Sequence, residues 1–336
     1  MADLKEVVAC MVFICVVIGI ILFATLTSGK SRDDVSFLVI GDFGGLPAFP
    51  YKTAVEEAVA IQMGKYARNN TVDFVLTLGD NFYYDGVKNI KDPRFQETYG
   101  NVFNQTSLNV DWYMMAGNHD YRGNISAQIA YTAVLERWQF PSYYYKLTFD
   151  IPSSDKTIDI LVLDTIMLCG NSDDFQDQMP QGPTSSEKAE TQWRWIQDNL
   201  QASRADYLIV AGHYPVISVG EHGPTPALFE RLMPMLHKNR VTAYFSGHDH
   251  NLQHLERENS WSTVNYFVSG AANFIDTSMR HAGDLPPDQL KFHWAKKLSL
   301  GGFGHVRVTD KTMTFGFYES FGKELYKHVM LPRNLK

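Results

Sequence analysis

The sequence has little cysteine and no excess of positive charge. Only three cysteines occur among 336 residues, and two of them, Cys10 and Cys15, lie inside one apolar run. Cys169 is left alone in the rest of the chain, so an intrachain disulfide within the globular part is excluded and cysteine usage does not identify the redox compartment. The formal net charge of -7 leaves no surplus of lysine and arginine to neutralise phosphates, so no nucleic-acid partner is expected.

Linkers and repeats are also missing. From about Val35 onward the chain has no Gly/Ser-rich tract, no internal repeat and no long run of one charge. A hydrophobic fraction of 45% and a charged fraction of 20% are typical of a globular protein and exclude a disordered one. Residues 35–336 are therefore predicted to form one catalytic domain of about 300 residues.

The first 34 residues contain the one long hydrophobic run. Residues 7–26 are 20 uncharged residues, enough for a helix to span a bilayer. A cleaved signal peptide is the alternative, but its apolar region is usually only about 7–15 residues long. We expect segment 1–34 to contain an uncleaved signal anchor, which would attach the domain to a membrane.

Short β-branched and aromatic runs alternate with helical patterns along the rest of the chain. The expected strands are 35–40, 72–78, 110–116, 158–163, 207–211, 241–246, 263–268, 305–308 and 313–318. The expected helices are 53–68, 126–138 and 185–200. In the last of these, Thr184 and Glu187 form a capping-box pattern, and one apolar face carries Ala189, Trp193, Ile196 and Leu200. Strands with helices between them predict sheet layers covered by helices.

Five of the expected strands end in glycine followed by a side chain that can bind a metal. These pairs are Gly41-Asp42, Gly79-Asp80, Gly117-Asn118, Gly212-His213 and Gly247-His248. Glycine allows the backbone to turn sharply at the strand tip and to approach a ligand closely. Loops at the C-terminal ends of strands are where open α/β sheets bind ligands. One such pair is usually a simple turn, but five in one chain predict a shared metal site.

The residue types in these motifs indicate the kind of metal. Imidazole nitrogens together with carboxylate oxygens suit first-row ions, and the absence of thiolates disfavours a structural zinc site. The ligands are too many for one tetrahedral ion, and a carboxylate can bridge two ions about 3.5–4 Å apart, as in two-metal hydrolases. A phenolate such as that of Tyr83 suits Fe(III).

These motifs resemble those of the metallophosphoesterase superfamily and, within it, those of the small, mammalian-type purple acid phosphatases. The similarity runs from about Phe37 to Met330 and includes the segments Glu221–Thr225 and Cys169–Asp174. The tyrosine in Gly-Asp-x-x-Tyr, here Tyr83, separates purple acid phosphatases from their calcineurin-like relatives. The fold that the resemblance implies is α/β: a four-layer αββα sandwich of two mixed β-sheets flanked by helices, with the metals at one edge.

The resemblance also implies a dinuclear centre, made of Fe(III) and a divalent ion that can be Fe, Zn or Mn. The ferric ion would be bound by Asp42, Tyr83 and His250. The divalent ion would be bound by Asn118, His213 and His248. Asp80 would bridge the two ions.

Two further histidines match residues that act on the substrate in this family. His119 and His222 resemble the histidines that hold the phosphate and help to protonate the leaving group. Asp120 and Asp249 lie inside the motifs and are expected to orient the ligands. The remaining histidines match no ligand motif and are expected to be surface or hydrogen-bonded core residues: His237, His254, His281, His293, His305 and His328.

The chain departs from the family pattern at one cysteine. Relatives pair the cysteine at position 169 with another just after the Gly-Pro-Thr stretch, where this chain has Ala227. The family's loop in this region represses activity until a protease cuts it. Residues 171–183 are polar and contain proline and glycine, as an exposed cleavable loop should be, so an activating protease is an expected partner.

The resulting hypothesis is an acid phosphatase that hydrolyses phosphomonoesters. Two alternatives remain: a phosphodiesterase or nucleotide pyrophosphatase on the same scaffold, and a non-catalytic iron-binding module. The expected location of the domain is lumenal or extracellular on a single-pass anchor, or secreted or lysosomal if the N-terminal segment is cleaved. Three N-x-S/T sequons, at Asn69, Asn104 and Asn124, agree with such a location.

Overall fold

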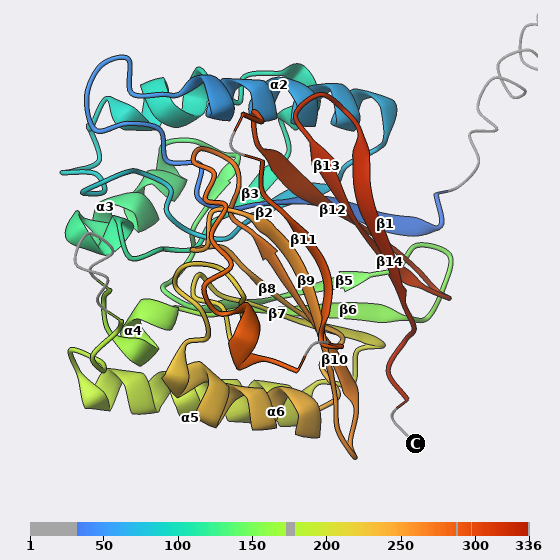
Figure 1. The fold of residues 1–336 in the computed structure, drawn as a ribbon. Coiled ribbons are helices and arrows are strands. Elements are labelled where there is room, and N and C mark those ends of the chain that lie inside the picture. The colour runs from blue at the N-terminus through green and yellow to red at the C-terminus, as the bar shows by residue number, and fades with distance from the viewer. Residues whose placement is uncertain (1–31, 173–178, 287, 297, 335–336) are drawn as a thin grey trace, which may run out of the picture.

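Two seven-stranded mixed sheets pack face to face, and helices cover their outer faces (Figure 1). The computed structural model describes residues 32–172, 179–286, 288–296 and 298–334. This arrangement confirms the expected four-layer α/β sandwich. The apolar run 7–26 lies outside the described residues, and within them no helix is long and apolar enough to cross a membrane.

The first sheet combines a parallel half with an antiparallel half. Its spatial order is β14 (Glu324–Met330), β13 (Met313–Glu319), β12 (Gly302–Thr309), β1 (Asp34–Ile40), β2 (Phe74–Thr77), β3 (Asp111–Tyr113) and β4 (Trp138–Gln139). β1 to β4 run parallel, and β1 pairs antiparallel with β12. The C-terminal ends of the parallel strands therefore lie at one edge, where the first three predicted metal-binding motifs follow them.

The second sheet has the same mixed character. Its order is β11 (Leu290–Trp294), β9 (Leu252–Glu258), β10 (Thr263–Ser269), β8 (Ala243–Ser246), β7 (Tyr207–Ala211), β6 (Thr157–Val162) and β5 (Tyr145–Asp150). β6, β7, β8 and β10 run parallel, while β5, β9 and β11 pair antiparallel with their neighbours. The other two motifs follow β7 and β8.

Helices form the two outer layers. Helix α2 (Ala54–Asn69) lies on the first sheet, and it begins with a capping box between Thr53 and Glu56. Helices α5 (Ser186–Ala202) and α6 (Met233–Lys238) lie on the second sheet. Helices α3 (Ile125–Ala130) and α4 (Thr165–Cys169) are short. Single turns of 3-10 or π type span Phe95–Gly100, Thr106–Leu108, Asp120–Arg122, Tyr131–Ala133, Leu228–Leu232 and Ala282–Asp284.

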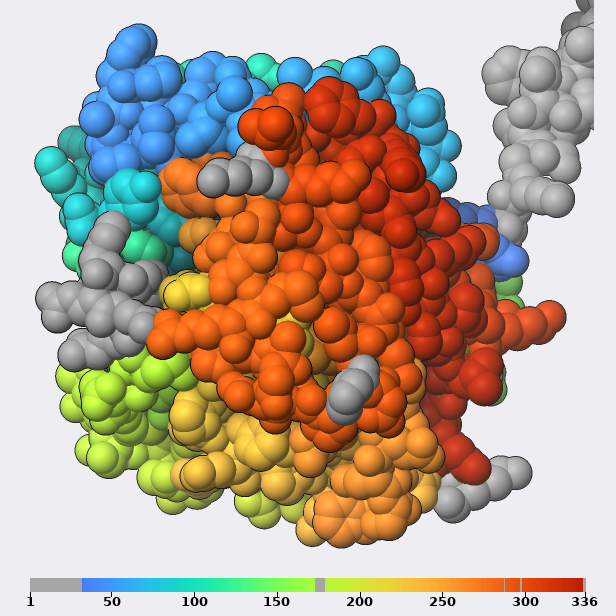
Figure 2. Space-filling view, viewed as in Figure 1, coloured from blue at the N-terminus to red at the C-terminus, as the bar shows by residue number. Residues whose placement is uncertain are grey.

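The alternation of side chains along the strands divides the core in two. Ile158, Ile160 and Val162 of β6 pack between the sheets, whereas Leu161 and the following Leu163 pack against α5 and α6. Both sets are buried, which is why the strands of the second sheet are apolar on both faces. Figure 2 shows the same layers from outside, with blue α2 at the top and the yellow-green helices at the bottom.

The strand predictions were more accurate than the helix predictions. All nine expected strands are present, although β3 is shorter than the expected 110–116, and β4, β5, β9, β11 and β14 were missed. The helix expected at 126–138 is wrong beyond Ala130: Trp138 instead pairs with Trp112 of β3 and donates from its indole to the Gln128 carbonyl at 2.9 Å. The chain therefore leaves the helix after Ala130 and goes on to pair, as β4, with β3.

Helix α5 illustrates a smaller error. The apolar face expected there is buried. The expected cap at Thr184 is wrong by one residue, because the Ser185 hydroxyl accepts the hydrogen bond from the Lys188 amide at 3.4 Å. Both residues are good N-caps, so sequence alone does not choose between them.

Candidate metal centre

Three of the five motifs contain a metal-capable residue with strained backbone. Asp42, Asp80 and His248 have φ angles of 59°, 53° and 68°, a region that costs a non-glycine residue about 1–3 kcal/mol. The neighbouring glycines leave room for these side chains. A Cβ atom at Gly117 would lie 2.1 Å from an Asp80 oxygen, and one at Gly247 would lie 2.3 Å from an Asp42 oxygen. Strain of this kind is concentrated at functional sites.

Three of the predicted ligands form one group of donor atoms. The Tyr83 hydroxyl lies 3.1 Å from Asp42 Oδ1 and 2.9 Å from His250 Nε2. His250 Nε2 lies 3.8 Å from Asp42 Oδ1. These are the residues that the resemblance assigns to the ferric ion, and they come from the loops after β1, β2 and β8. A carboxylate, a phenol and an imidazole directed at one point form the donor set that suits a hard, highly charged ion.

A second group faces the first. His213 Nε2 lies 2.8 Å from Asn118 Oδ1, and the rings of His213 and His248 are 5.0 Å apart. His213 Nδ1 lies 2.8 Å from the Leu78 carbonyl, which can only accept, so Nδ1 donates to it. Nε2 faces two oxygens, one of Asn118 and one of Asp80, and a cation bound among them would take the place of a proton. A backbone carbonyl on the far nitrogen is the usual way in which proteins orient a metal-binding imidazole.

Asp80 lies between the two groups. Its Oδ2 is 3.6 Å from His213 Nε2, and one ligand atom from each of Asp42, Asp80 and His213 lies within 4.8 Å of the others. The structure thus brings all seven predicted ligands to one edge of the sandwich, with Asp80 where the resemblance puts the bridging carboxylate.

The electrostatics of this edge fit a bound cation. Asp42 and Asp80 are 0% and 1% exposed. Burial, followed by the negative charge of Asp80, raises the pKa of Asp42 well above its ordinary value. Two buried carboxylates so close together repel each other unless a cation lies between them. Positive ions would therefore stabilise the folded state as well as the site.

Backbone amides hold the carboxylates in place. The His248 amide donates to both Asp42 oxygens, at 3.1 and 2.9 Å, and the His119 amide donates to Asp80 Oδ1 at 3.0 Å. Asp120 accepts from the Gly117 amide at 2.9 Å, and burial, followed by the charge of Asp80, raises the pKa of Asp120 to about 7. Asp120 thus lies beneath the turn that carries Asn118.

The two predicted catalytic histidines flank the ligands. The ring of His119 lies 4.7 Å from that of Tyr83, and its Nδ1 is 2.8 Å from the Tyr84 carbonyl. The ring of His222 stacks on that of His248 with centroids 4.1 Å apart. The His222 amide donates to Asp249 Oδ1 at 2.9 Å, and the other Asp249 oxygen accepts from the Ser218 hydroxyl. Asp249 therefore fixes the loop that presents His222.

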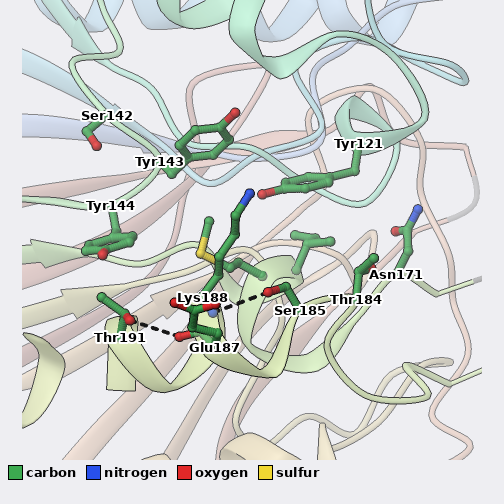
Figure 3. A pocket seen from close by; sticks show the side chains of 12 residues that line it. Tyr121, Ser142, Tyr143, Tyr144, Asn171, Thr184, Ser185, Glu187, Lys188 and Thr191 are labelled. Carbon is green, nitrogen blue, oxygen red and sulfur yellow. Dashed lines mark hydrogen bonds between the residues drawn. The ribbon is translucent and has the colours of Figure 1, made fainter. Parts of the chain in front are cut away.

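Two cavities lie near this edge, and only one of them reaches a predicted site residue. A cavity of about 470 Å³ is lined by His222 together with Glu221, Arg280 and His281. A cavity of about 730 Å³ is lined by Tyr121, Tyr143, Tyr144 and Lys188, whose amine points upward between the tyrosine rings (Figure 3). None of the nine predicted site residues lines the second cavity, so the chemistry is assigned to the first.

The structure also adds residues that sequence reasoning missed. The ring of Phe274 lies 5.0 Å from that of Tyr83 and 5.6 Å from that of His250, so it forms an apolar wall beside the first donor group. Phe274 follows β10, whose end carries Gly270. This glycine is followed by Ala271 and not by a side chain that can bind a metal, so the pattern of the five motifs did not point to Phe274.

Cys169, whose partner cysteine in the family is replaced by Ala227 in this chain, forms no disulfide within the described residues. Cys169 is a free, buried thiol, and burial raises its pKa to about 12, so it is unreactive as a nucleophile. Ala227 stands at the start of the turn 228–232. Of the expected cleavable segment 171–183, residues 173–178 lie outside the described residues. Ser172, at its beginning, is buried and its amide donates to the Tyr214 hydroxyl at 3.0 Å.

Comparison with known proteins agrees with this geometry. Residues 35–252 match the model of the calcineurin-like phosphoesterase family. Tartrate-resistant acid phosphatase type 5 of Mus musculus is 48% identical over 316 residues, which cover 94% of this chain and 95% of the relative. Purple acid phosphatase 17 of Arabidopsis thaliana is 33% identical over 89% of this chain and 85% of its own length.

A solved structure of lower sequence identity shares the fold. GAP50, described as the anchor in the inner membrane complex of Plasmodium, superposes with a TM-score of 0.75 at 22% identity, covering 91% of each chain. At that identity the likeness speaks for the fold alone. The family match and the two enzyme relatives go further, and with the donor groups at the sheet edge they show that this chain belongs to the calcineurin-like phosphoesterase family, in the branch of the purple acid phosphatases.

Proposed function

We propose that the protein is an acid phosphatase that hydrolyses phosphomonoesters at a dinuclear centre of Fe(III) and a divalent ion. The observation that carries the proposal is the position of Asp80 between two donor groups of different chemistry. Asp42, Tyr83 and His250 would hold the ferric ion. Asn118, His213 and His248 would hold the divalent ion, which Fe, Zn or Mn would each suit.

The two ions, when bound, supply Lewis acidity and positive charge for a phosphate dianion. The chain itself supplies the proton chemistry. The His222 ring lies against His248 and also lines the 470 Å³ cavity, so it connects the metal centre with a space where the leaving group fits. His222 is placed to donate a proton to the leaving oxygen, while His119 on the other flank holds the phosphoryl oxygens.

The exposure of the predicted ligands indicates the side from which substrate approaches the metal centre. The Asp42, Asn118 and His213 side chains are completely buried, whereas 23% of the His250 side chain is exposed. Solvent and substrate therefore reach the centre from the side of His250 and His222. Phe274 and Tyr84 stack beside that opening and exclude water from the rest of the first donor group.

Colour and substrate preference test the proposal together. Purified protein is expected to be purple or pink from a tyrosinate–ferric charge-transfer band, and Tyr83→Phe is expected to bleach it. Phosphate release from a monoester should exceed that from a diester and fall as the pH rises above neutral. Retained colour in Tyr83→Phe, a preference for the diester, or a rate still rising through about pH 8 would each contradict it.

The membrane location is a separate proposal. We infer that residues 7–26 anchor the domain on the lumenal or extracellular side, and that the 171–183 segment is cut by an activating protease. All three sequon asparagines, Asn69, Asn104 and Asn124, are exposed, as glycosylation requires. Glycosidase digestion and alkaline extraction of membranes would test the location; an unglycosylated, freely extracted protein would contradict it.

A further inference from the structure

A second cluster of side chains that can bind a metal lies between β14, the edge strand of the first sheet, and β9, the second strand of the other sheet. His254 and Glu256 are two residues apart on β9, and Tyr326 and His328 are two residues apart on β14. Residues two apart on a strand share a face, so each strand presents a pair of polar side chains to the other. β9 belongs to the second sheet and β14 to the first. Figure 1 shows β14 beside β9 and β11, and the rings of Phe292 on β11 and Tyr326 stack at 4.6 Å.

The distances within this cluster suit one cation. The rings of His254 and His328 have centroids 4.5 Å apart, and Glu256 Oε2 lies 3.9 Å from His328 Nε2. One ligand atom from each of the three residues lies within 4.8 Å of the others. Small side-chain rotations would close these gaps, because both Glu256 and His328 are only half-buried.

His254 is already oriented as a ligand. Its Nε2 lies 3.0 Å from Asn265 Oδ1, and its ring stacks on Phe267 at 4.3 Å with an angle of 12° between the planes. An amide oxygen only accepts, so Nε2 carries the proton and Nδ1 keeps the lone pair. Nδ1 accepts from the Tyr326 hydroxyl at 2.8 Å, on the side of β14, and a bound ion would displace this hydrogen bond. A hydrogen bond on the far nitrogen is how proteins orient metal-binding imidazoles.

Burial favours the neutral form of both imidazoles, which is the form that binds metals. Burial, followed by the charge of His328, lowers the pKa of His254 to about 3. Burial also lowers the pKa of His328. The remaining charged neighbour is Lys291 of β11, whose amine lies 3.4 Å from Glu256 Oε1 and competes for that oxygen. Oε2 stays directed at His328.

We propose that His254, Glu256 and His328 form an additional divalent-cation site, of a chemistry that suits Zn²⁺. Two imidazoles and a carboxylate are a known zinc ligand set, in which water completes the coordination. A hollow of about 520 Å³ lined by Glu256 and His328 gives the ion a path from solvent. The site lies away from the dinuclear centre, because β9 carries Glu256 about 13 Å from its first residue, Leu252. A bound ion would crosslink the two sheets, so the site would stabilise the fold rather than take part in hydrolysis.

Metal counting on the intact holoenzyme tests the proposal. Protein with its dinuclear centre saturated is equilibrated with zinc, and bound metal is measured by elemental analysis and calorimetry. One zinc per chain beyond the pair is expected, with a raised midpoint of thermal unfolding, since an ion that binds only the folded state stabilises it. His328→Ala and Glu256→Gln should each weaken this binding at least about tenfold. Absence of the additional ion in the wild type would overturn the proposal.

Two further variants separate a site from a general effect of surface charge. Lys291→Ala removes the competitor for Glu256 and should strengthen zinc binding. Glu258→Gln removes an exposed carboxylate two residues further along β9 and should leave binding unchanged. Phosphatase activity and the unfolding midpoint without zinc check that His328→Ala is folded. Zinc affinity that is the same in His328→Ala and Glu256→Gln as in the wild type, or that falls equally in Glu258→Gln, would contradict the assignment.

Discussion

The histidines that follow strands have a different environment from His305, which lies within a strand. His213 and His248 follow β7 and β8, and their rings face other metal-binding side chains. His305 lies inside β12, where one ring nitrogen lies 2.8 Å from the Ser36 hydroxyl and the other 2.9 Å from the Tyr66 hydroxyl. Burial lowers the pKa of His305 to about 4. Position relative to the strand end therefore distinguishes the two groups, although the residue type and the burial are the same.

This difference in surroundings explains why the candidate site forms at one edge of the fold. Inside its strand, His305 has a hydrogen-bonding partner at each ring nitrogen, so the protein itself satisfies this histidine. Beyond the C-terminal ends of the parallel strands the sheet hydrogen bonds stop, and the loops that follow lie together at one edge of the sandwich. Side chains in these loops are therefore available to bind a metal ion or a substrate.

The largest effect should come from the carboxylate between the two donor groups. Asp80→Asn removes one negative charge and the oxygen best placed to bind both ions. Activity should fall about a thousandfold or more, since the metals supply several kcal/mol of transition-state stabilisation. Metal content and phosphate release are measured together, with the exposed helix variant Asp198→Asn as control. Full activity in Asp80→Asn would remove the basis for the assigned site.

A smaller effect is expected where a histidine acts on the substrate without binding metal. His222→Ala should lower kcat about a hundredfold, the usual contribution of a proton donor, while both metals stay bound. His281→Ala, which changes the same cavity away from His248, is the matched control and should alter kcat only slightly. Loss of metal in His222→Ala would show that this residue is a ligand.

The smallest effect on activity should follow from changing a strand histidine. The folded pKa of His305 is about 4 against an ordinary value of 6.5, so between these pH values the unfolded chain binds more protons. Its contribution to stability is complete above pH 6.5 and falls on acidification by up to about 1.4 kcal/mol per pH unit. His305→Gln should therefore flatten the decline of unfolding free energy between pH 6.5 and 4, measured by urea denaturation. An unchanged pH dependence of the unfolding free energy, or a large loss of activity per folded molecule, would contradict the purely structural role of His305.

Much of the candidate site could be predicted because its signals are local. A glycine directly after an apolar strand marks a sharp turn, and a polar side chain next to it can be recognised without knowing its neighbours. Gly79-Asp80 and Gly247-His248 were found in this way. Helix α2 was predicted from its alanine- and glutamate-rich composition, which is also local, and the structure adds a capping box between Thr53 and Glu56.

The failures have a tertiary cause. The segment at Trp138 has a helical pattern, but β3 offers it a strand to pair with, and that contact overrides the local preference. His254 and His328 lie 74 positions apart in different sheets, so no spacing in the sequence predicts that their rings meet. Phe274 was missed because an apolar ring beside a metal centre has no motif of its own.

The kind of chemistry could be read from the amino-acid sequence, because ligand types and the glycines before them are properties of short segments. Which donors lie close enough to share an ion, and which histidines are hydrogen-bonded within the core, depends on the folded arrangement. The reason is that strand order and the packing of one sheet on the other set distances between residues far apart in the chain. Local interactions do not specify those distances.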